Sequence, residues 1–322
     1  MATSLQNRGI WEDLKPAARQ KLTALPSDLA QPTLGLSYGI LSEIKGQMTA
    51  LYHCAWKVNF NQKLESFEKD SIQGLKNLLD ICLSCYAPGP PRVCFCSSIG
   101  TVLRTSVLII AEELPERFED AQPTGYAQSK LVGEHICTHV ATLTGLPVYV
   151  VRIGQIIGDT ERGIWNHLEA IPLLMQTART LGALPAIDEE LRWLPVDVAA
   201  RCLIEITSSS ANTGTFNLVN RHTIHWTRDI LTMLRDAGME FEVLDPPAWV
   251  ERLRKSEQDP AKNPPIKLLE YFVRQYDTIR PRRQCDFIVE KAGLASSTFR
   301  EVKAPDSELI RKIVAYFQAN HW

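Results

Sequence analysis

Three short segments in the middle of the chain restrict its fold more than any others. An apolar run at residues 93–96 ends directly in Ser97-Ser98, and a second apolar run lies at 147–151. Between them stands Tyr126, the one tyrosine of eight that has a lysine, Lys130, four positions later. Residues i and i+4 lie on the same face of a helix, so this spacing brings the phenol and the ammonium into the same space. The order of strand, serine, helix and strand predicts an α/β fold.

The Tyr126 and Lys130 pair also carries a chemical expectation. A lysine beside a tyrosine favours the phenolate and lowers the pKa of the phenol, which makes the tyrosine a proton donor or acceptor near neutral pH. The alternative is an exposed helix with a chance pair of these residues. The flanking strands favour the functional interpretation.

The hydrophobic periodicity extends this pattern along the chain. Strands are predicted at 49–55, 92–96, 148–152 and 215–219. Helices are predicted at 11–25, 64–85, 124–142, 165–183 and 197–207, and then at 227–237, 248–256, 266–277 and 306–319. Alternating strands and helices indicate a parallel sheet with helices on both faces. We expect a Rossmann-like core at 1–220 and a mainly helical subdomain at 221–322.

Composition excludes several classes of partner. The chain has 322 residues and a net charge of −2, which offers no electrostatic footprint for a nucleic acid or a membrane surface. No run of apolar residues approaches the roughly 20 that a membrane span needs. The first fifteen residues hold no apolar signal segment, so the expected location is cytoplasmic and the eight cysteines are expected to be reduced. Cys82-x-x-Cys85 is only half of a zinc motif, and no metal is predicted.

Longer motifs carry a resemblance to a known family. They are the nine residues from His53 to Asn61, the segment 95–99, the segment 121–126, the segment Arg152 to Asp159, and Trp193-Leu-Pro-Val-Asp. In these motifs the chain resembles the thioester reductase domains of carboxylic acid reductases and of enzymes like non-ribosomal peptide synthetases, in particular their fungal branch. Such domains are extended short-chain dehydrogenases/reductases with a Rossmann-type sheet. The resemblance covers nearly the whole chain.

The resemblance implies a reaction and its participants. The reaction is the NADPH-dependent reduction of an acyl thioester on the phosphopantetheine arm of an acyl or peptidyl carrier protein, with release of an aldehyde or alcohol in secondary metabolism. Tyr126 would donate a proton to the substrate oxygen, and Lys130 would hold the nicotinamide ribose. Ser98 would hydrogen-bond the carbonyl oxygen, with Ser97 as the alternative. These roles agree with the general chemistry of proton transfer and of donors aimed at developing negative charge.

Further residues are expected near the cofactor or the substrate. The resemblance places Asp28 at the adenine, and the other candidate cofactor neighbours lie at the ends of strands: His53, Ala55, Ser97, Ile153, Gly154 and Gln155. Candidate linings of the acyl or pantetheine pocket are Trp165, Asn166 and Trp193, although large aromatic side chains more often pack in a core. For His53 and Asn59 the alternative is a hydrogen-bonded polar residue in or beside the core.

The expected glycine-rich turn departs from this family pattern. In dinucleotide folds it follows the first strand, and the N-terminus of the next helix receives the pyrophosphate. No glycines here have G-x-G-x-x-G or G-x-x-G-x-x-G spacing, and only 27 residues precede Asp28, whereas a βαβ unit takes about 30 or more. We therefore expect a sheet without its first strand, an unpaired edge at 49–55 and weak NADPH binding. A shortened gene model, a piece excised from a longer synthetase, or recruitment to another task would each account for this.

Three functions remain open at this point. The first is the reductase. The second is release of a carrier-bound chain by cyclisation without NADPH, which the missing turn favours. The third is a catalytically inactive module that binds a carrier protein, whose binding would be indifferent to Tyr126→Phe.

Overall fold

The computed structural model describes residues 1–209, 213–278 and 285–322. Contacts divide the chain into two compact units that alternate along the sequence. The first unit comprises Met1–Ser106, Glu112–Arg152 and Ser210–Phe216, and the second comprises Val107–Ala111, Ile153–Ser209 and Asn217–Trp322. The expected division into domains at residue 220 stays a prediction.

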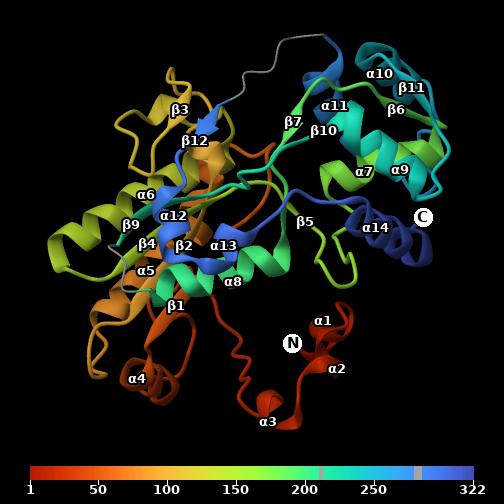
Figure 1. The fold of residues 1–322 in the computed structure, drawn as a ribbon. Coiled ribbons are helices and arrows are strands. Elements are labelled where there is room, and N and C mark those ends of the chain that lie inside the picture. The colour runs from red at the N-terminus through yellow and green to blue at the C-terminus, as the bar shows by residue number, and fades with distance from the viewer. Residues whose placement is uncertain (210–212, 279–284) are drawn as a thin grey trace. The chain divides into compact units, whose positions relative to one another are not determined.

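A four-stranded parallel sheet with the order β1-β2-β4-β9 organises the first unit (Figure 1). Its strands are β1 (Ala50–His53), β2 (Arg92–Ser98), β4 (Val148–Ile153) and β9 (Gly214–Leu218), which confirm the four predicted strands. The register pairs Ala50 with Arg92 and His53 with Phe95. β2 and β4 are near-continuous apolar runs, as is typical of parallel strands that are buried on both faces.

Two helices cover one face of this sheet. α5 (Gln73–Leu83) and α6 (Gly125–Thr144) contribute Leu75, Leu79 and Cys137 to a core that includes Val93 and Phe95 of β2. α6 approaches β2 closely at Gly133, where an added Cβ would lie 2.7 Å from the Phe95 ring. The predicted helix at 64–85 is confirmed with an irregular start, η1 (Leu64–Phe67) and η2 (Glu68–Ile72).

The predicted amphipathic helix at 11–25 is wrong. This region forms two single turns, α2 (Ile10–Asp13) and α3 (Pro16–Arg19), and none of their residues is buried. Pro16 lacks an N–H, so it starts a new turn instead of continuing the first. A short helix that is not packed into a core is marginal in water, and here no residue of either turn is buried.

The remaining elements of the first unit are short. They are α1 (Ala2–Gln6), α4 (Tyr38–Gln47), η3 (Ile99–Thr101) and η4 (Phe118–Asp120). α4 begins at a serine cap, where the Ser37 hydroxyl accepts from the Ile40 N–H at 3.4 Å. β1 is an edge strand, and within the described residues no strand pairs with its outer side. The expected unpaired edge is therefore present, and it leaves Ala50 and Tyr52 exposed.

The second unit is mainly helical, with short strand pairs. Its helices are α7 (Ala170–Thr180), α8 (Val196–Ser208), η5 (Trp226–Ile230), α9 (Leu231–Asp236), α10 (Pro246–Arg254), η6 (Pro264–Leu268), α11 (Leu269–Tyr276), α12 (Glu290–Ala295), α13 (Ser297–Glu301) and α14 (Ser307–Asn320). Its strand pairs are β3 (Ile109–Ile110) with β12 (Asp286–Phe287), β5 (Ile156–Ile157) with β8 (Leu194–Pro195), β6 (Ala183–Pro185) with β11 (Glu242–Leu244), and β7 (Glu190–Leu191) with β10 (Ile224–His225).

One large apolar core holds the second unit together. It joins α7, α9, α10 and α14 around Trp193 and Trp249, both of which are fully buried. The predicted helix at 165–183 starts later than expected, at Ala170, because residues 165–169 form a turn in which the Glu169 N–H donates to the Asn166 carbonyl. Within the described ranges, no helix has both the length and the apolar character needed to cross a membrane.

Candidate active site

The helix that carries Tyr126 and Lys130 begins at a well-defined cap. The Thr124 hydroxyl accepts from the Ala127 N–H at 3.2 Å, which satisfies one of the free donors of the first turn. Gly125 is the first helical residue, and a Cβ there would lie 2.4 Å from the Gln62 carbonyl oxygen. Only glycine lets the loop before η1 pass this close to the helix. The cap and the glycine therefore fix where Tyr126 stands.

Ser98 and Tyr126 form a hydrogen-bonded pair at the end of β2. The Ser98 hydroxyl donates to the phenol oxygen, and both side chains are half-buried, so solvent reaches them. The Ser98 oxygen also accepts from the Gly100 N–H at 3.2 Å. Two hydroxyl groups that meet at an accessible position can both direct hydrogen bonds to one substrate oxygen.

Ser97 points the other way and belongs to a buried network. Its hydroxyl donates to Glu134 Oε1 at 2.5 Å, and the residue is buried. The sequence left open which serine of the pair faces the site. The structure separates them, since only Ser98 contacts Tyr126, while Ser97 lies against a carboxylate behind it.

Lys130 lies inside the unit rather than at its surface. Its ammonium donates to the Cys96 carbonyl oxygen and lies 4.4 Å from the centre of the Trp56 ring and 4.8 Å from that of Phe95. Such cation–π contacts favour the charged form. Burial acts more strongly and lowers the pKa of Lys130 to about 8. A lysine with this pKa carries a partial population of neutral amine near physiological pH.

The pKa of Tyr126 departs from the sequence-based expectation. Burial raises the phenol's pKa above its ordinary value of 10, and the hydrogen bond from Ser98 opposes this only in part. The expected lowering by Lys130 is therefore wrong in this structure, because the ammonium is held by the Cys96 carbonyl and the aromatic rings. A raised pKa keeps the phenol protonated at neutral pH, which is the state that a proton donor requires.

A buried ion pair, which the sequence reasoning missed, supports the site from behind. The Glu134 carboxylate accepts hydrogen bonds from Nε and Nη2 of Arg152 at 2.7 to 3.1 Å, and both side chains are fully buried. The same carboxylate accepts from Ser97 and, at 2.9 Å, from Thr101. It thereby links α6 to β2, to η3 and to β4. Two signals were available: Glu134 repeats the four-residue spacing after Lys130, and Arg152 is the charged end of an apolar strand.

Phe60 lies against the face of the candidate proton donor. Its ring meets the Tyr126 ring edge to face, with centroids 5.2 Å apart, and half of its surface is exposed. The segment that follows β1 thus places the Trp56 ring against Lys130 and the Phe60 ring against Tyr126. An exposed apolar ring beside a reactive hydroxyl is suited to contact an apolar ligand. Phe60 lies within the motif His53 to Asn61, but its spacing in the sequence gave no signal of this contact.

The other candidate cofactor residues of the first unit differ in their surroundings. His53 is buried, and its ring stacks on Phe95 while Nε2 has no described hydrogen-bond partner. Burial lowers the pKa of His53 to about 4, so it is neutral. Ala55 is exposed. Asp28 is also exposed, and the hydrogen bond from Gln31 lowers its pKa because the carboxylate organises its own turn. Nε2 of His53 therefore has no hydrogen-bond partner among the described residues, whereas the Asn59 side-chain oxygen accepts a hydrogen bond from the Asn61 N–H.

The second unit contains the candidate cofactor residues Ile153, Gly154 and Gln155, and backbone hydrogen bonds hold two of them in place. The Gly154 N–H donates to the Leu218 carbonyl at 3.0 Å, and the Gln155 carbonyl accepts from the Leu194 N–H at 2.9 Å. Ile153 is half-buried, and the Gln155 side chain is exposed and bonds the Ile156 carbonyl. Their role at a cofactor stays a prediction.

The three candidate substrate residues also lie in the second unit. Trp193 is 1% exposed and Trp165 5% exposed, and they pack edge to face within the core. The Trp165 N–H donates to Glu169 at 3.0 Å. Both indoles are packed in the apolar core, as the packing alternative expects, and their role at a substrate pocket stays a prediction. Asn166 is exposed, and its side chain accepts from the Leu168 N–H.

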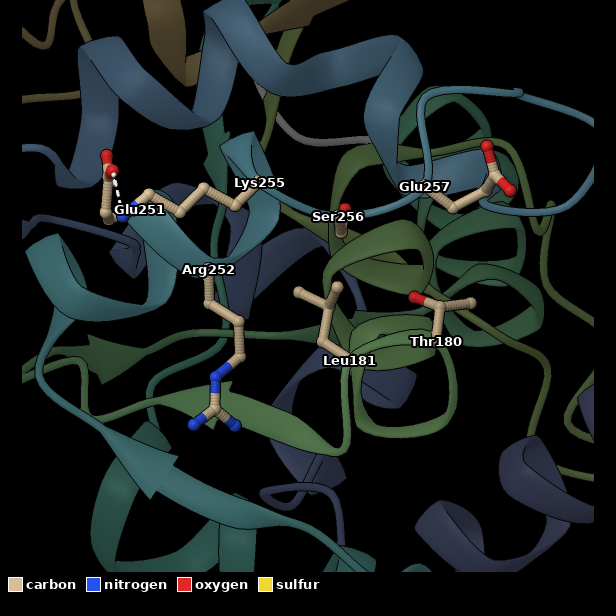
Figure 2. A pocket seen from close by; sticks show the side chains of 7 residues that line it. All are labelled: Thr180, Leu181, Glu251, Arg252, Lys255, Ser256 and Glu257. Atoms are coloured by element: carbon tan, nitrogen blue, oxygen red, sulfur yellow. Dashed lines mark ion pairs between the residues drawn. The ribbon is translucent and has the colours of Figure 1, made fainter.

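The second unit also has a surface pocket of about 570 Å³ (Figure 2). Its lining residues are Thr180, Leu181, Glu251, Arg252, Lys255, Ser256 and Glu257. Lys255 pairs with Glu251 at 3.1 Å and Arg252 pairs with Glu242 at 2.9 Å, so the basic groups are neutralised. None of the candidate site residues lines this pocket. Among the described residues, no group of three or more histidine, cysteine or carboxylate side chains is arranged to hold a metal ion.

The chain is similar in sequence to a known protein family. A sequence profile described as male sterility protein, a family of NAD-binding domains, matches residues 1–203. The chain belongs to this family. It is 33% identical over 279 residues to the adenylate-forming reductase Nps10 of Heterobasidion annosum, a match that covers 84% of this chain and 25% of that protein. It is 32% identical over 262 residues to the carboxylic acid reductase of Neurospora crassa, covering 76% of this chain and 24% of that protein.

A solved structure extends the likeness to the fold. The terminal R domain from the myxalamid PKS-NRPS biosynthetic pathway superposes with a TM-score of 0.83 at 22% identity, covering 99% of this chain and 82% of that chain. The predicted resemblance and the Rossmann-type fold are thereby confirmed. The chain spans about a quarter of the length of the two curated relatives.

The residues present fit one part of a nicotinamide dinucleotide. Tyr126 and Lys130 offer a donor pair one helical turn apart, and His53 offers an unpartnered buried nitrogen near Lys130. The described residues show no glycine-rich turn that would cradle a pyrophosphate. Among the described residues, the fit is therefore to the nicotinamide and ribose.

Proposed function

We propose that the chain is a reductase domain that uses NADPH to reduce an acyl thioester presented on the phosphopantetheine arm of a carrier protein. The observation that carries this proposal is the hydrogen-bonded Ser98–Tyr126 pair, which is half-buried, with Lys130 one turn further along the same helix. The relatives, which are named as reductases, support the reaction class.

The residues take distinct roles in this proposal. Ser98 and Tyr126 would bind the thioester carbonyl oxygen, and Tyr126 would deliver a proton to it, since its raised pKa keeps the phenol protonated. Lys130 and His53 would hold the nicotinamide ribose. The cofactor, when bound, supplies the hydride that the carbonyl carbon receives. The carrier thiol leaves, and the acyl group is released as an aldehyde or, after a second reduction, as an alcohol.

Phe60 would contribute to substrate binding. Its exposed ring next to Tyr126 would contact the apolar part of the acyl chain or the pantetheine arm. Hence Phe60→Ala should raise KM for the thioester more than it lowers kcat.

The test begins with titration of the full chain with NADPH, using NADH for comparison. An acyl pantetheine thioester is then added and the products are weighed by mass spectrometry. We expect NADPH to bind. The product should have the mass of the aldehyde, which is one oxygen atom lighter than the free acid, or of the alcohol, which is two hydrogens heavier than the aldehyde. Tyr126→Phe should lower kcat at least about 100-fold. Tyr86→Phe is the matched control, because the Tyr86 hydroxyl bonds Ser42 on the exposed surface of the first unit.

Two results would overturn the proposal. One is the absence of NADPH binding together with release of an unreduced or cyclised product, which would support the cyclising release that the missing glycine spacing favours. The other is carrier-protein binding that Tyr126→Phe leaves unchanged in a chain without turnover, which would indicate an inactive binding module.

A further inference from the structure

Cys54 and Cys96 face each other across two neighbouring strands of the first unit. The register of β1 and β2 pairs His53 with Phe95, so the next residues, Cys54 and Cys96, stand side by side. Their sulfur atoms are 3.3 Å apart. Cys54 is exposed, whereas Cys96 is buried. One thiol of the pair is thus open to a reagent in solvent, and the other is directly behind it.

The geometry is close to that of a disulfide. Neighbouring strands lie about 4.8 Å apart, which is inside the range of about 4.4 to 6.8 Å between the Cα atoms of disulfide-bonded residues. A disulfide bond is about 2.05 Å long, so the sulfur atoms would have to approach by about 1.3 Å. Cys54 follows the last residue of an edge strand, where the backbone can adjust more easily than in the sheet centre.

We propose that Cys54 and Cys96 form a thiol–disulfide modification site, which a two-electron thiol oxidant such as a peroxide converts to an intramolecular disulfide. The Cys54 sulfur would attack a peroxide oxygen, the O–O bond would break, and an alcohol or water would leave as a sulfenic acid forms. The Cys96 sulfur would then attack the Cys54 sulfur and release water. Two thiols lose two electrons and two protons, and one peroxide accepts them.

The position of the pair connects this bond to the candidate active site. The Cys96 carbonyl accepts the hydrogen bond of Lys130, and the chain continues from Cys96 into Ser97 and Ser98. A bond to Cys54 would fix the end of β2 next to both groups. Spacing along the sequence singles out Cys82 with Cys85 and does not reveal this pair, because Cys54 and Cys96 are 42 positions apart.

The acid–base state of the thiols sets the rate. The hydrogen bond to Cys96 and burial raise the pKa of the Cys54 thiol. The bond from Cys54 lowers the pKa of Cys96, but hydrogen bonding to Cys94 and burial raise it to about 12. Both groups are therefore neutral at pH 7, and since the thiolate is the nucleophile, oxidation should accelerate about tenfold per pH unit between pH 7 and 9.

The test uses the full chain, reduced, freed of reductant and treated with diamide, an azo compound that accepts two electrons and two protons. We expect the number of thiols titrated in denaturant to fall from eight to six. A non-reducing tryptic digest should contain peptide 46–57 linked to peptide 93–104, and fragmentation should place the bond on Cys96 and not on Cys94. Dithiothreitol should restore all eight thiols.

Variants decide whether this pair is responsible. Cys54→Ser and Cys96→Ser should each keep all seven remaining thiols, whereas Cys85→Ser should fall from seven to five. Cys85 is a matched control because its partly buried thiol bonds the Ile81 carbonyl. The proposal is overturned if the wild-type chain keeps eight thiols, if another pair is linked, or if the bond joins two chains. The digest of the wild-type protein decides this even where a variant does not fold.

Discussion

Ser97 and Ser98 are adjacent in sequence, yet their hydroxyl groups bind to different partners. Ser97 donates to the buried carboxylate of Glu134, while Ser98 donates to the half-buried phenol of Tyr126. A hydrogen bond to a buried charge contributes about 1.5–3 kcal/mol, and one between neutral groups about 1 kcal/mol. We expect Ser97→Ala to lower the free energy of unfolding by the larger amount and Ser98→Ala by the smaller. Urea denaturation at pH 7 measures both, and the reverse order would contradict the assignment of the two serines.

Lys130 makes the stability of the fold depend on pH. Its pKa is about 8 in the folded state and 10.5 ordinarily, because burial disfavours the ammonium. Below pH 8 Lys130 is charged in the folded state, so the whole free-energy cost of burying the ammonium lowers the stability of the fold. Between pH 8 and 10.5 the unfolded chain binds more protons, so the wild-type protein gains stability as the pH rises.

Relative to Lys130→Met, the wild-type free energy of unfolding should thus increase by about 3 kcal/mol between pH 7 and 10.5. The measurement is urea denaturation of both proteins at several pH values in this interval. Lys76→Met, at an exposed ion pair with Asp80, is the control and should show no such trend. A constant difference between wild type and Lys130→Met would show that Lys130 is not desolvated.

At the scale of elements, helix α6 is tied to the sheet by one ion pair. Glu134 and Arg152 are fully buried, so removing either side chain takes away several buried hydrogen bonds and the opposite charge that the other side chain faces. We expect Glu134→Gln and Arg152→Met each to cost about 3–5 kcal/mol in unfolding free energy. The double variant should cost less than the sum of the two single losses, since each single change already removes the interaction between the two side chains.

A double-mutant cycle by chemical denaturation measures this coupling. The exposed pair Lys76 and Asp80 is the control, and Lys76→Ala should change stability by about 0.5 kcal/mol or less. Additive losses for Glu134 and Arg152 would show that the two side chains do not depend on each other.

The start of the same helix depends on a glycine. An alanine Cβ at Gly125 would lie 2.4 to 2.7 Å from backbone atoms of Gln62, Lys63 and Leu64. Backbone cannot yield as a flexible side chain can, so Gly125→Ala should cost about 1–3 kcal/mol or more and displace the loop beside Tyr126. Gly39→Ala in α4 has no atom within 4 Å of the new Cβ and should stabilise the fold by about 0.5–1 kcal/mol. Thermal unfolding of the two variants checks the difference in sign.

For the whole molecule, the two compact units differ in their cores. The second unit has one large apolar cluster that joins α7, α9, α10 and α14, and the first unit has a smaller one between α5, α6 and the sheet. Local opening requires less free energy where less apolar surface is buried. In hydrogen–deuterium exchange, amides of α7 and α14 should therefore exchange more slowly than those of β1 and α4, and residues 1–28 should exchange first. Equal protection throughout would contradict this ranking.

The sequence alone determined the local patterns that need few partners. Apolar runs predicted β2 and β4, because strands buried on both faces leave little choice of side chain. Shorter apolar segments predicted β1 and β9. The four-residue spacing predicted that Tyr126 and Lys130 share a helix, and long motifs predicted the family.

Only the tertiary structure decided what depends on contacts distant in sequence. The helix predicted at 11–25 did not form as one element, because Pro16 starts a new turn and no residue of either turn is buried in a core. Trp165 and Trp193 proved to be core residues, and Lys130 was directed to the Cys96 carbonyl instead of the phenol. Burial, and with it the direction of each pKa shift, is a property of the packed chain. Spacing along one helix cannot reveal it, since the groups that surround a side chain come from other elements.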